Sequence, residues 1–256
     1  MRIVVKVGTS TLAHATGRLN IRRVEALVKV LSDLKNAGHE LILVSSGAIG
    51  MGVGKLNLPG RPEDMPGKQA AAAVGQCELM YTYDRLFSQY SHTVGQILLT
   101  GEDVEHADRC ENFKNTVERL LDLGVLPVIN ENDTIATAEI KVGDNDTLGA
   151  IVSRHIKADL LILLSDINGL YSADPRTDPH ATLIPLVMSV TPEIEALAGS
   201  KGSELATGGM ATKLRAAKLV NEVGCDMVIL NGEHPELLYD LLDGKQVGTR
   251  FLGKGL

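Results

Sequence analysis

Apolar residues follow two alternating patterns along the chain. Short, nearly continuous apolar runs occupy residues 3–7, 40–45, 93–100, 125–130, 159–165 and 226–230. Between them, apolar residues recur at helical spacing over residues 21–36, 68–90, 113–123, 146–157, 210–223 and 236–242. Continuous apolar runs are typical of strands buried on both faces, and alternation with helices favours parallel pairing. The pattern therefore predicts an α/β fold, a three-layer αβα sandwich around a mostly parallel central sheet.

Local signals predict several helix ends and loops. Asn20 is placed to cap the 21–36 helix, and Gly38 is placed to end it. Thr191 and Pro192 predict a short helix, because proline is favoured at the first helical position. Residues 58–67 hold three prolines and two glycines and are predicted to form an irregular loop, while residues 137–142 are predicted to form a hairpin arm.

Composition limits the classes of function. The chain has 256 residues, of which 44% are hydrophobic, so it can bury a large core as one domain or two. A net charge of −7 and only 3% aromatic residues argue against nucleic-acid binding. No apolar run reaches the roughly 20 residues that span a bilayer, so we expect no membrane partner and a cytoplasmic location. The histidines and cysteines are scattered, which makes a zinc site improbable.

Glycines and polar residues follow the predicted strands, where parallel sheets bind ligands. Lys6 interrupts the first apolar run and precedes Gly8. A buried lysine is costly without a partner, so Lys6 either faces phosphate oxygens or reaches solvent from an edge strand. The turn SSGAIGMG, residues 45–52, offers backbone amides at a helix start, which can bind an anion or simply allow close packing.

Two polar clusters, NENDT at 130–134 and GDNDT at 143–147, lie close together in the sequence. Asn and Asp are common in turns, but one cluster follows a buried strand and the other opens a helix. Asn145 is placed to cap that helix while presenting its amide to a ligand, and Asp144 and Asp146 are suited to hold a lysine or a magnesium ion.

The segment TGGMATK, residues 207–213, does not match the phosphate loop G-x-x-x-x-G-K-[ST], because Lys213 follows the second glycine by four residues and Leu214 comes next. Its glycines permit close approach of the backbone to a ligand, and it opens a helix with Lys213 one turn in. A helix N-terminus with a lysine is an anion site without being a phosphate loop.

Taken together, these segments resemble the amino acid kinase family. The K-x-G-x-S/T start, the DINGLYSADPR loop at 166–176 and the GGM-x-x-K helix start occur in this order. The segments at 45–52, 68–76, 130–134, 142–150 and 207–213 most resemble the branch that acts on glutamate. The resemblance implies the αβα fold and transfer of a phosphoryl group from ATP, with Mg²⁺, to the side-chain carboxylate of L-glutamate, the first step of proline synthesis.

The resemblance also implies roles for particular residues. Lys6 and Lys213 would neutralise the transferring phosphoryl group, and Asp146 would order the two lysines. Glutamate-binding positions match Ser46, Asp133 and Asn145, with Asn130 as a helper. The ATP site matches Lys6, Gly8, Ser165, Asp166, Thr207, Gly208, Gly209, Met210, Ala211, Thr212 and Lys213. Mg²⁺ would be held mainly by the ATP phosphates, and its protein ligands stay unassigned.

The same resemblance predicts one amino acid kinase domain over residues 1–256, with an amino-acid lobe to about 160 and a nucleotide lobe from about 161. Many relatives carry an extra C-terminal RNA-modification-type domain, and we expect none here, which is a departure from that pattern. It also predicts a homodimer or homotetramer and proline as a feedback inhibitor acting near residues 58–67.

Two alternatives remain open. One is a sister kinase that acts on acetylglutamate, aspartate, carbamate or UMP. The other is a nucleotide-binding sensor on the same fold without catalysis, because fold alone does not fix function. Lys6, Asp146 and Lys213 together argue against the sensor. A carboxylate nucleophile, with a pKa of about 4.3, is already ionised at neutral pH and needs no general base, which agrees with the lack of a candidate catalytic histidine.

Overall fold

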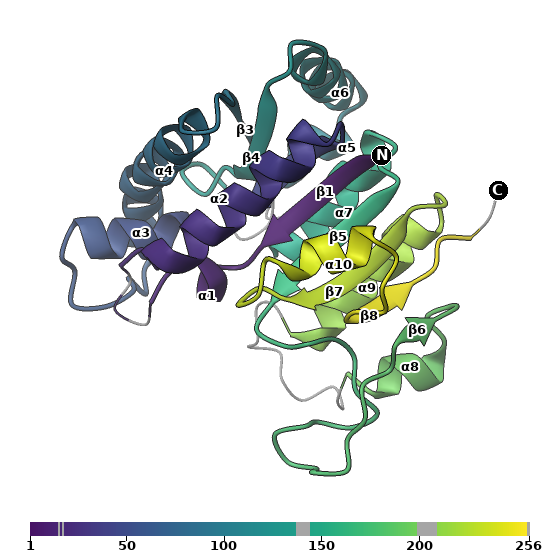
Figure 1. The fold of residues 1–256 in the computed structure, drawn as a ribbon. Helices are drawn as coiled ribbons and strands as arrows, with labels where there is room; N and C mark the ends of the chain where they lie inside the picture. Colours follow the sequence, from purple (N-terminus) through teal and green to yellow (C-terminus); the bar gives the residue numbers. More distant parts are fainter. Residues whose placement is uncertain (15, 17, 137–143, 199–208, 255–256) are drawn as a thin grey trace.

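The computed structural model describes residues 1–14, 16, 18–136, 144–198 and 209–254. Among these residues, the strands are β1 (Arg2–Val7), β2 (Glu40–Ser45), β3 (Val94–Leu99), β4 (Leu126–Glu131), β5 (Leu160–Ser165), β6 (Leu186–Val187), β7 (Asp226–Asn231) and β8 (Thr249–Phe251). They form one sheet in the order β3-β4-β2-β1-β5-β7-β8-β6 (Figure 1). All pairs are parallel except β7 with β8.

The described helices connect these strands. They are α1 (Thr9–Leu12), α2 (Ile21–Asn36), α3 (Ala48–Lys55), α4 (Met65–Ser88), α5 (Gly101–Glu105), α6 (Ala107–Asp122), α7 (Asn145–His155), α8 (Pro192–Ala196), α9 (Met210–Asn221) and α10 (Leu237–Leu242). Asn20 caps α2 by accepting from the backbone of Arg23, and Thr191 caps α8, as predicted. Gly38, just past α2, has φ +93°, which glycine adopts without strain.

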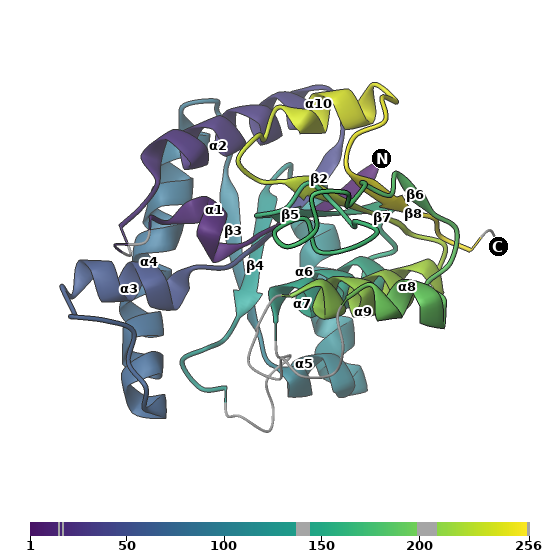
Figure 2. The same cartoon turned by 90° about the horizontal axis from the view of Figure 1, so that it is seen from below.

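Helices cover both faces of the sheet, so the predicted three-layer α/β architecture is confirmed (Figures 1 and 2). Odd-numbered residues of β1, such as Val5, pack with α2, α4 and α10 in one apolar cluster. Val4 packs with α6, α7 and α9 in a second cluster on the opposite face. Successive strand residues point to opposite faces, so Lys6 shares the face of Val4, beneath α7 and α9.

The predicted core strands and helices are confirmed, with shifted ends. Pro66 lies in the first turn of α4, whose N-cap Asp64 accepts from Gly67 N at 2.7 Å. The prediction of an irregular loop through residue 67 was therefore wrong, because Asp64 and Pro66 start a helix there. α6 begins at Ala107, earlier than predicted, and β6 and β8 were not predicted because they are short. The predicted hairpin at 137–142 falls outside the described residues.

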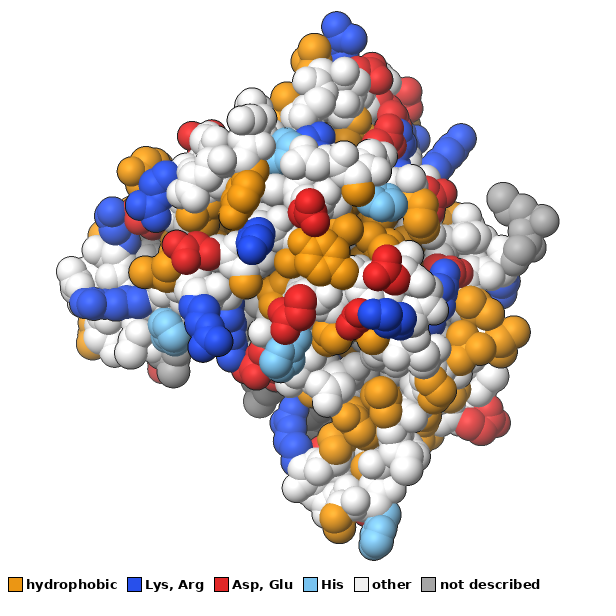
Figure 3. Space-filling model, viewed as in Figure 1, with side chains coloured by type: hydrophobic (Ala, Val, Ile, Leu, Met, Phe, Trp, Pro, Cys, Tyr) orange, Lys and Arg blue, Asp and Glu red, His pale blue; other side chains and the backbone are white. Residues whose placement is uncertain are grey.

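Side chains of several kinds cover the surface over α2 and α10. Figure 3 shows acidic and basic side chains interspersed there, with apolar side chains between them. In the part of the chain that the structure describes, no helix combines the length and apolar character needed to cross a bilayer.

Helices α3 and α4 pack backbone to backbone through two glycines. A Cβ placed on Gly75 of α4 would lie 1.7 Å from the Ala48 carbonyl oxygen in α3. A Cβ placed on Gly52 of α3 would lie 1.8 Å from the Ala71 carbonyl oxygen in α4. The neighbouring atoms are backbone and cannot rotate away. These contacts fix α4 relative to the turn that follows β2.

We predict that Gly75→Ala destabilises the protein by about 2–3 kcal/mol, because overpacking against backbone exceeds the roughly 1 kcal/mol that alanine gains over glycine in a helix. The change in unfolding free energy is measured by urea denaturation. Gly60→Ala is the matched control, because nothing lies within 4 Å of a Cβ at that exposed glycine. Equal stability of the two variants would contradict the packing described here.

Candidate active site

Two lysines from distant parts of the sequence meet at one buried carboxylate. Lys6 Nζ lies 2.7 Å from Asp146 Oδ1, and Lys213 Nζ lies 3.0 Å from Asp146 Oδ2. The exposed fractions of the three residues are 8%, 3% and 1% for Lys6, Lys213 and Asp146. The expected convergence of Lys6 and Lys213 is confirmed. Because β1 lies in the middle of the sheet, the alternative of an edge-strand lysine reaching solvent is wrong.

Three elements deliver this triad to the carboxyl edge of the sheet. Lys6 is the penultimate residue of β1, Asp146 lies in the first turn of α7, and Lys213 lies in the first turn of α9. Gly149 lets α7 approach the sheet closely, since a Cβ there would lie 3.3 Å from Leu161 Cδ1 of β5 and in ordinary contact, at 3.5 Å, with Lys6 Cβ. The fold therefore brings the three charges together through packing of rigid elements.

The carboxylate at the centre stays ionised. Burial alone would raise the pKa of the Asp146 carboxyl, but the ammonium groups of Lys6 and Lys213 outweigh it and hold that pKa below its ordinary value. Thr212 Oγ1 lies within hydrogen-bond reach of Asp146 Oδ2, at 3.0 Å, and of the Gly209 carbonyl oxygen, at 2.7 Å. Two ammonium groups around one carboxylate leave a net positive charge, which favours an anion nearby.

A glycine lies near each lysine in the chain, Gly8 two residues after Lys6 and Gly209 four residues before Lys213. A Cβ on Gly8 would lie 3.6 Å from Lys6 Nζ and 3.8 Å from the carbonyl oxygen of Leu164. Gly209 is the N-cap residue of α9, and Met210 and Ala211 are its first residues, so their backbone amides open the helix. The predicted ATP-site residues Thr207 and Gly208 fall outside the described residues.

A second group of polar side chains adjoins the triad through Asn145. Asn145 Nδ2 lies 2.8 Å from Ser46 Oγ, 3.0 Å from Asn130 Oδ1 and 3.0 Å from the Ser45 carbonyl oxygen. Ser46 follows β2 and Asn130 lies near the end of β4. Three of the predicted glutamate-binding residues, Ser46, Asn130 and Asn145, are thus in direct contact.

Asp144, not Asn145, caps α7. Its side chain accepts from Thr147 N at 2.8 Å and from Thr147 Oγ1 at 2.9 Å. The prediction that Asn145 caps the helix was therefore wrong, since Asn145 is the first helical residue. With the cap supplied by Asp144, the Asn145 amide contacts Ser46 and Asn130 instead. Asp146 contacts the two lysines.

The other predicted residues lie along the same edge of the sheet. Asp133 is half-buried in the turn after β4. Ser165 ends β5, which pairs with β1, and its Oγ donates to Asp166 Oδ1 at 3.1 Å. These residues therefore lie at the carboxyl ends of two strands, and the Ser165 carbonyl oxygen also accepts from Gly232 N at 2.7 Å.

Gln76 and Tyr83 were not predicted as site residues. Asn130 Nδ2 donates to Gln76 Oε1 at 2.9 Å, and Ser45 Oγ lies 2.8 Å from Tyr83 Oη. Gln76 and Tyr83 lie on α4 and are buried. A signal exists in the sequence, because Gln76 interrupts an apolar helical stripe that includes Ala72, Leu79 and Tyr83. A polar residue at such a position requires a hydrogen-bond partner.

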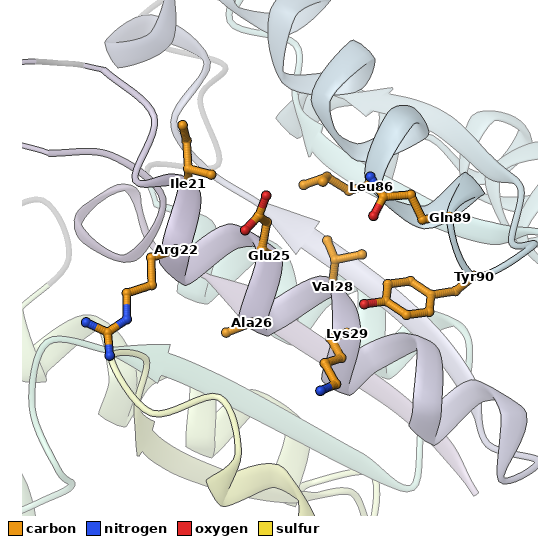
Figure 4. Close-up of a pocket in the computed structure, with 9 residues that line it drawn as sticks. All are labelled: Ile21, Arg22, Glu25, Ala26, Val28, Lys29, Leu86, Gln89 and Tyr90. Atoms are coloured by element: carbon orange, nitrogen blue, oxygen red, sulfur yellow. The ribbon is translucent and has the colours of Figure 1, made fainter.

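A surface hollow lies away from these residues. Its volume is about 640 Å³, and it lies between α2 and the end of α4 (Figure 4). It is lined by Ile21, Arg22, Glu25, Ala26, Val28, Lys29, Leu86, Gln89 and Tyr90. Helices α2 and α4 cover the face of the sheet opposite Lys6. This hollow therefore lies across the sheet from the triad.

Within the described ranges, no group of three or more His, Cys, Asp and Glu side chains lies close enough to share a metal ion. Both oxygens of Asp146 already lie within 3.0 Å of lysine nitrogens. The described side chains therefore do not form a resident metal centre.

The chain is similar to known kinases over nearly its whole length. The model of the amino acid kinase family matches residues 1–231. A glutamate 5-kinase of Clostridium tetani is 55% identical, with 97% of this chain and 93% of that protein covered. A glutamate 5-kinase of Clostridium perfringens is 52% identical, with 99% and 96% covered.

The fold comparison agrees. The structure of carbamate kinase from Giardia lamblia bound to AMP-PNP superposes with a TM-score of 0.71 at 17% identity, covering 99% of this chain and 98% of that one. At that identity the likeness concerns the fold alone. The family match and the two close relatives cover far more than half of the sequence, and the chain therefore belongs to the amino acid kinase family.

Proposed function

We propose that the protein phosphorylates the side-chain carboxylate of L-glutamate with ATP, giving L-glutamyl 5-phosphate and ADP in the first step of proline biosynthesis. The observation that carries the proposal is the Lys6–Asp146–Lys213 triad, with the two ion-pair distances of 2.7 and 3.0 Å. Relatives named glutamate 5-kinase at 55% and 52% identity support the choice of glutamate within the family.

The positive charge of the triad can offset the main electrostatic obstacle to this reaction. A substrate carboxylate and the γ-phosphate are both anions, and two unit charges about 3.5 Å apart repel by roughly 5 kcal/mol at an effective dielectric near 20. Left uncompensated, this repulsion would slow the reaction by about three to four decades. Lys6 and Lys213 supply positive charge where the two anions meet, and Asp146 holds both ammonium groups in place before substrate binds.

The amide group beside the triad is suited to the amino acid. Ser46, Asn130 and Asn145 offer hydroxyl and amide groups that recognise carboxylate and ammonium groups, and Asp133 supplies a negative charge for an ammonium group. Because Asn145 and Asp146 are consecutive, glutamate bound at Asn145 would have its side-chain carboxylate directed to the lysines.

ATP supplies the phosphoryl group, and its site is proposed on the other side of the triad. Gly8, the start of α9 and the residues at the end of β5 would hold the phosphates and the nucleoside. Mg²⁺ enters the proposal as the companion of the ATP phosphates. This division assigns residues up to about 160 to the amino-acid lobe and those from about 161 to the nucleotide lobe.

The family resemblance further leads us to propose a homodimer or homotetramer and inhibition by proline. Of the segment suggested for proline, residues 65–67 now belong to α4. The irregular part of that segment is therefore shorter than the sequence indicates.

The function is tested by ADP release from ATP with each of glutamate, acetylglutamate, aspartate, carbamate and UMP, with hydroxylamine to trap any acyl phosphate. Glutamate alone is expected to give both ADP and hydroxamate, and added proline is expected to reduce both. Turnover with another acceptor but not with glutamate would assign the chain to a sister activity. ATP binding without turnover of any acceptor would favour a sensor.

Replacing Lys213 with Met keeps most of the side-chain length and removes the charge. We expect turnover to fall by roughly two to three orders of magnitude, as when a group that stabilises transition-state charge is lost, while glutamate binding stays measurable by calorimetry. Lys218→Met on the same helix removes a charge from an exposed pair with Glu195 and is the control. Turnover within threefold of the parent in Lys213→Met would exclude the assigned role.

Asp133→Asn tests the amino-acid end of the site. The substrate ammonium would lose a charge-assisted hydrogen bond worth roughly 1.5–3 kcal/mol, so KM for glutamate is expected to rise about 10- to 100-fold while KM for ATP changes little. Asp122→Asn at the exposed end of α6 is the control. An effect confined to ATP would show that the two ends of the site are assigned the wrong way round.

A further inference from the structure

We propose that Gln76 is a positioning residue for the glutamate site, acting through Asn130 on Asn145. The inference rests on the proposed function and extends it to α4, a helix that contributes none of the residues assigned above. Its physical basis is a chain of hydrogen-bonded, buried amide groups. Because a nitrogen donates and an oxygen accepts, the orientation of each amide fixes that of its neighbour.

The chain of hydrogen bonds begins at a backbone group that cannot turn over. Glu131 N donates to Asn130 Oδ1 at 2.9 Å. A backbone N–H is always a donor, so the atom of the Asn130 amide that faces it must be the oxygen. The nitrogen of the same amide then faces α4, where it donates to Gln76 Oε1 at 2.9 Å. Gln76 must therefore present its carbonyl oxygen to Asn130.

The chain of hydrogen bonds continues from Asn130 to Asn145, at the centre of the proposed glutamate site. Asn130 Oδ1 accepts from Asn145 Nδ2 at 3.0 Å. The Asn145 amide nitrogen is thereby held between Asn130 Oδ1 and Ser46 Oγ. The amide oxygen of Asn145 is on the other side of the same group, so its direction is fixed by the same contacts. Glu131 N sets the orientation of the Asn130 amide, and Gln76 holds that amide in the position that presents Oδ1 to Asn145.

Burial makes this dependence strong. Gln76 is 7% exposed and Asn130 is 2% exposed. A buried amide nitrogen that loses its acceptor has little access to water, so Asn130 would rotate or shift to recover a partner. Any such movement displaces Asn130 Oδ1 from Asn145. Gln76 contacts neither the triad nor Ser46 through any hydrogen bond described above, so the effect reaches the site through Asn130.

The backbone of α4 is itself fixed beside the site. Gly75, the residue before Gln76, packs on the Ala48 carbonyl oxygen at the start of α3, two residues after Ser46. Tyr83 on the same helix lies 2.8 Å from Ser45 Oγ. The position from which Gln76 reaches Asn130 is therefore set by the same turn that carries Ser46.

The test compares Gln76→Met, which keeps the shape and removes the acceptor, with Gln76→Glu, which keeps an acceptor oxygen for Asn130. Gln89→Met, at the exposed end of the same helix, is the matched control. Steady-state kinetics with glutamate and with ATP, and a thermal unfolding curve, are measured for each protein. Should Gln76→Met fail to fold, Gln76→Asn withdraws the amide by one carbon and makes the same comparison.

For Gln76→Met we expect KM for glutamate to rise roughly tenfold, the value of one hydrogen bond, with kcat and KM for ATP within threefold of the parent. Gln76→Glu is expected to return KM for glutamate to within threefold. A merely structural role would lower kcat, raise both KM values, or leave Gln76→Glu as impaired as Gln76→Met, and each of these results overturns the proposal. Parent protein without glutamate turnover would instead overturn the proposed function, on which the inference rests.

Discussion

The candidate active site depends on one buried carboxylate that two cations share. Asp146 is 1% exposed, and both of its oxygens lie within 3.0 Å of a lysine nitrogen. Burying a lysine without a partner is costly, and removing one partner of a buried ion pair typically destabilises a protein by about 3–5 kcal/mol. Asp146 therefore makes it possible to keep two ammonium groups side by side in the interior. The lysines are aligned without a bound anion, so little reorganisation would be needed in the proposed phosphoryl transfer.

The surrounding fold serves this arrangement by joining rigid elements at the carboxyl edge of the sheet. Lys6 comes from the central strand β1, and the other two charges come from the first turns of α7 and α9. Glycines permit the close approach, at Gly149 of α7 and at the α3–α4 contact. On the amino-acid side, hydrogen bonds link Gln76 of α4 through Asn130 to Asn145 in the proposed glutamate site.

Most of the architecture could be predicted from the sequence, because buried parallel strands and long amphipathic helices carry strong local patterns. The continuous apolar run of β5 and the capped start of α2 are examples. Meeting of Lys6 and Lys213 was expected from resemblance and from the unusual placement of a lysine in an apolar run. Hydrophobic periodicity alone does not predict this meeting, because the two residues come together only through packing of α7 and α9 on β1.

Details that depend on competition between neighbouring residues were harder to predict. Asp144 and Asn145 are both good capping residues, and only the structure shows that Asp144 takes the cap and leaves Asn145 for Ser46 and Asn130. The early start of α4 depends on Asp64 overriding the proline-rich composition around it. The role of Gln76 is not visible in local sequence because its partner, Asn130, is 54 residues away.

The adjacency of Asn145 and Asp146 on one helical turn has a thermodynamic consequence. A ligand that tightens the contacts of Asn145 also restrains the carboxylate that aligns the lysines, and a ligand that draws on the lysines restrains Asn145 in return. Such linkage is reciprocal, so each substrate should strengthen the binding of the other by the same factor. The N-terminal turn of α7 would then couple the binding of the two substrates.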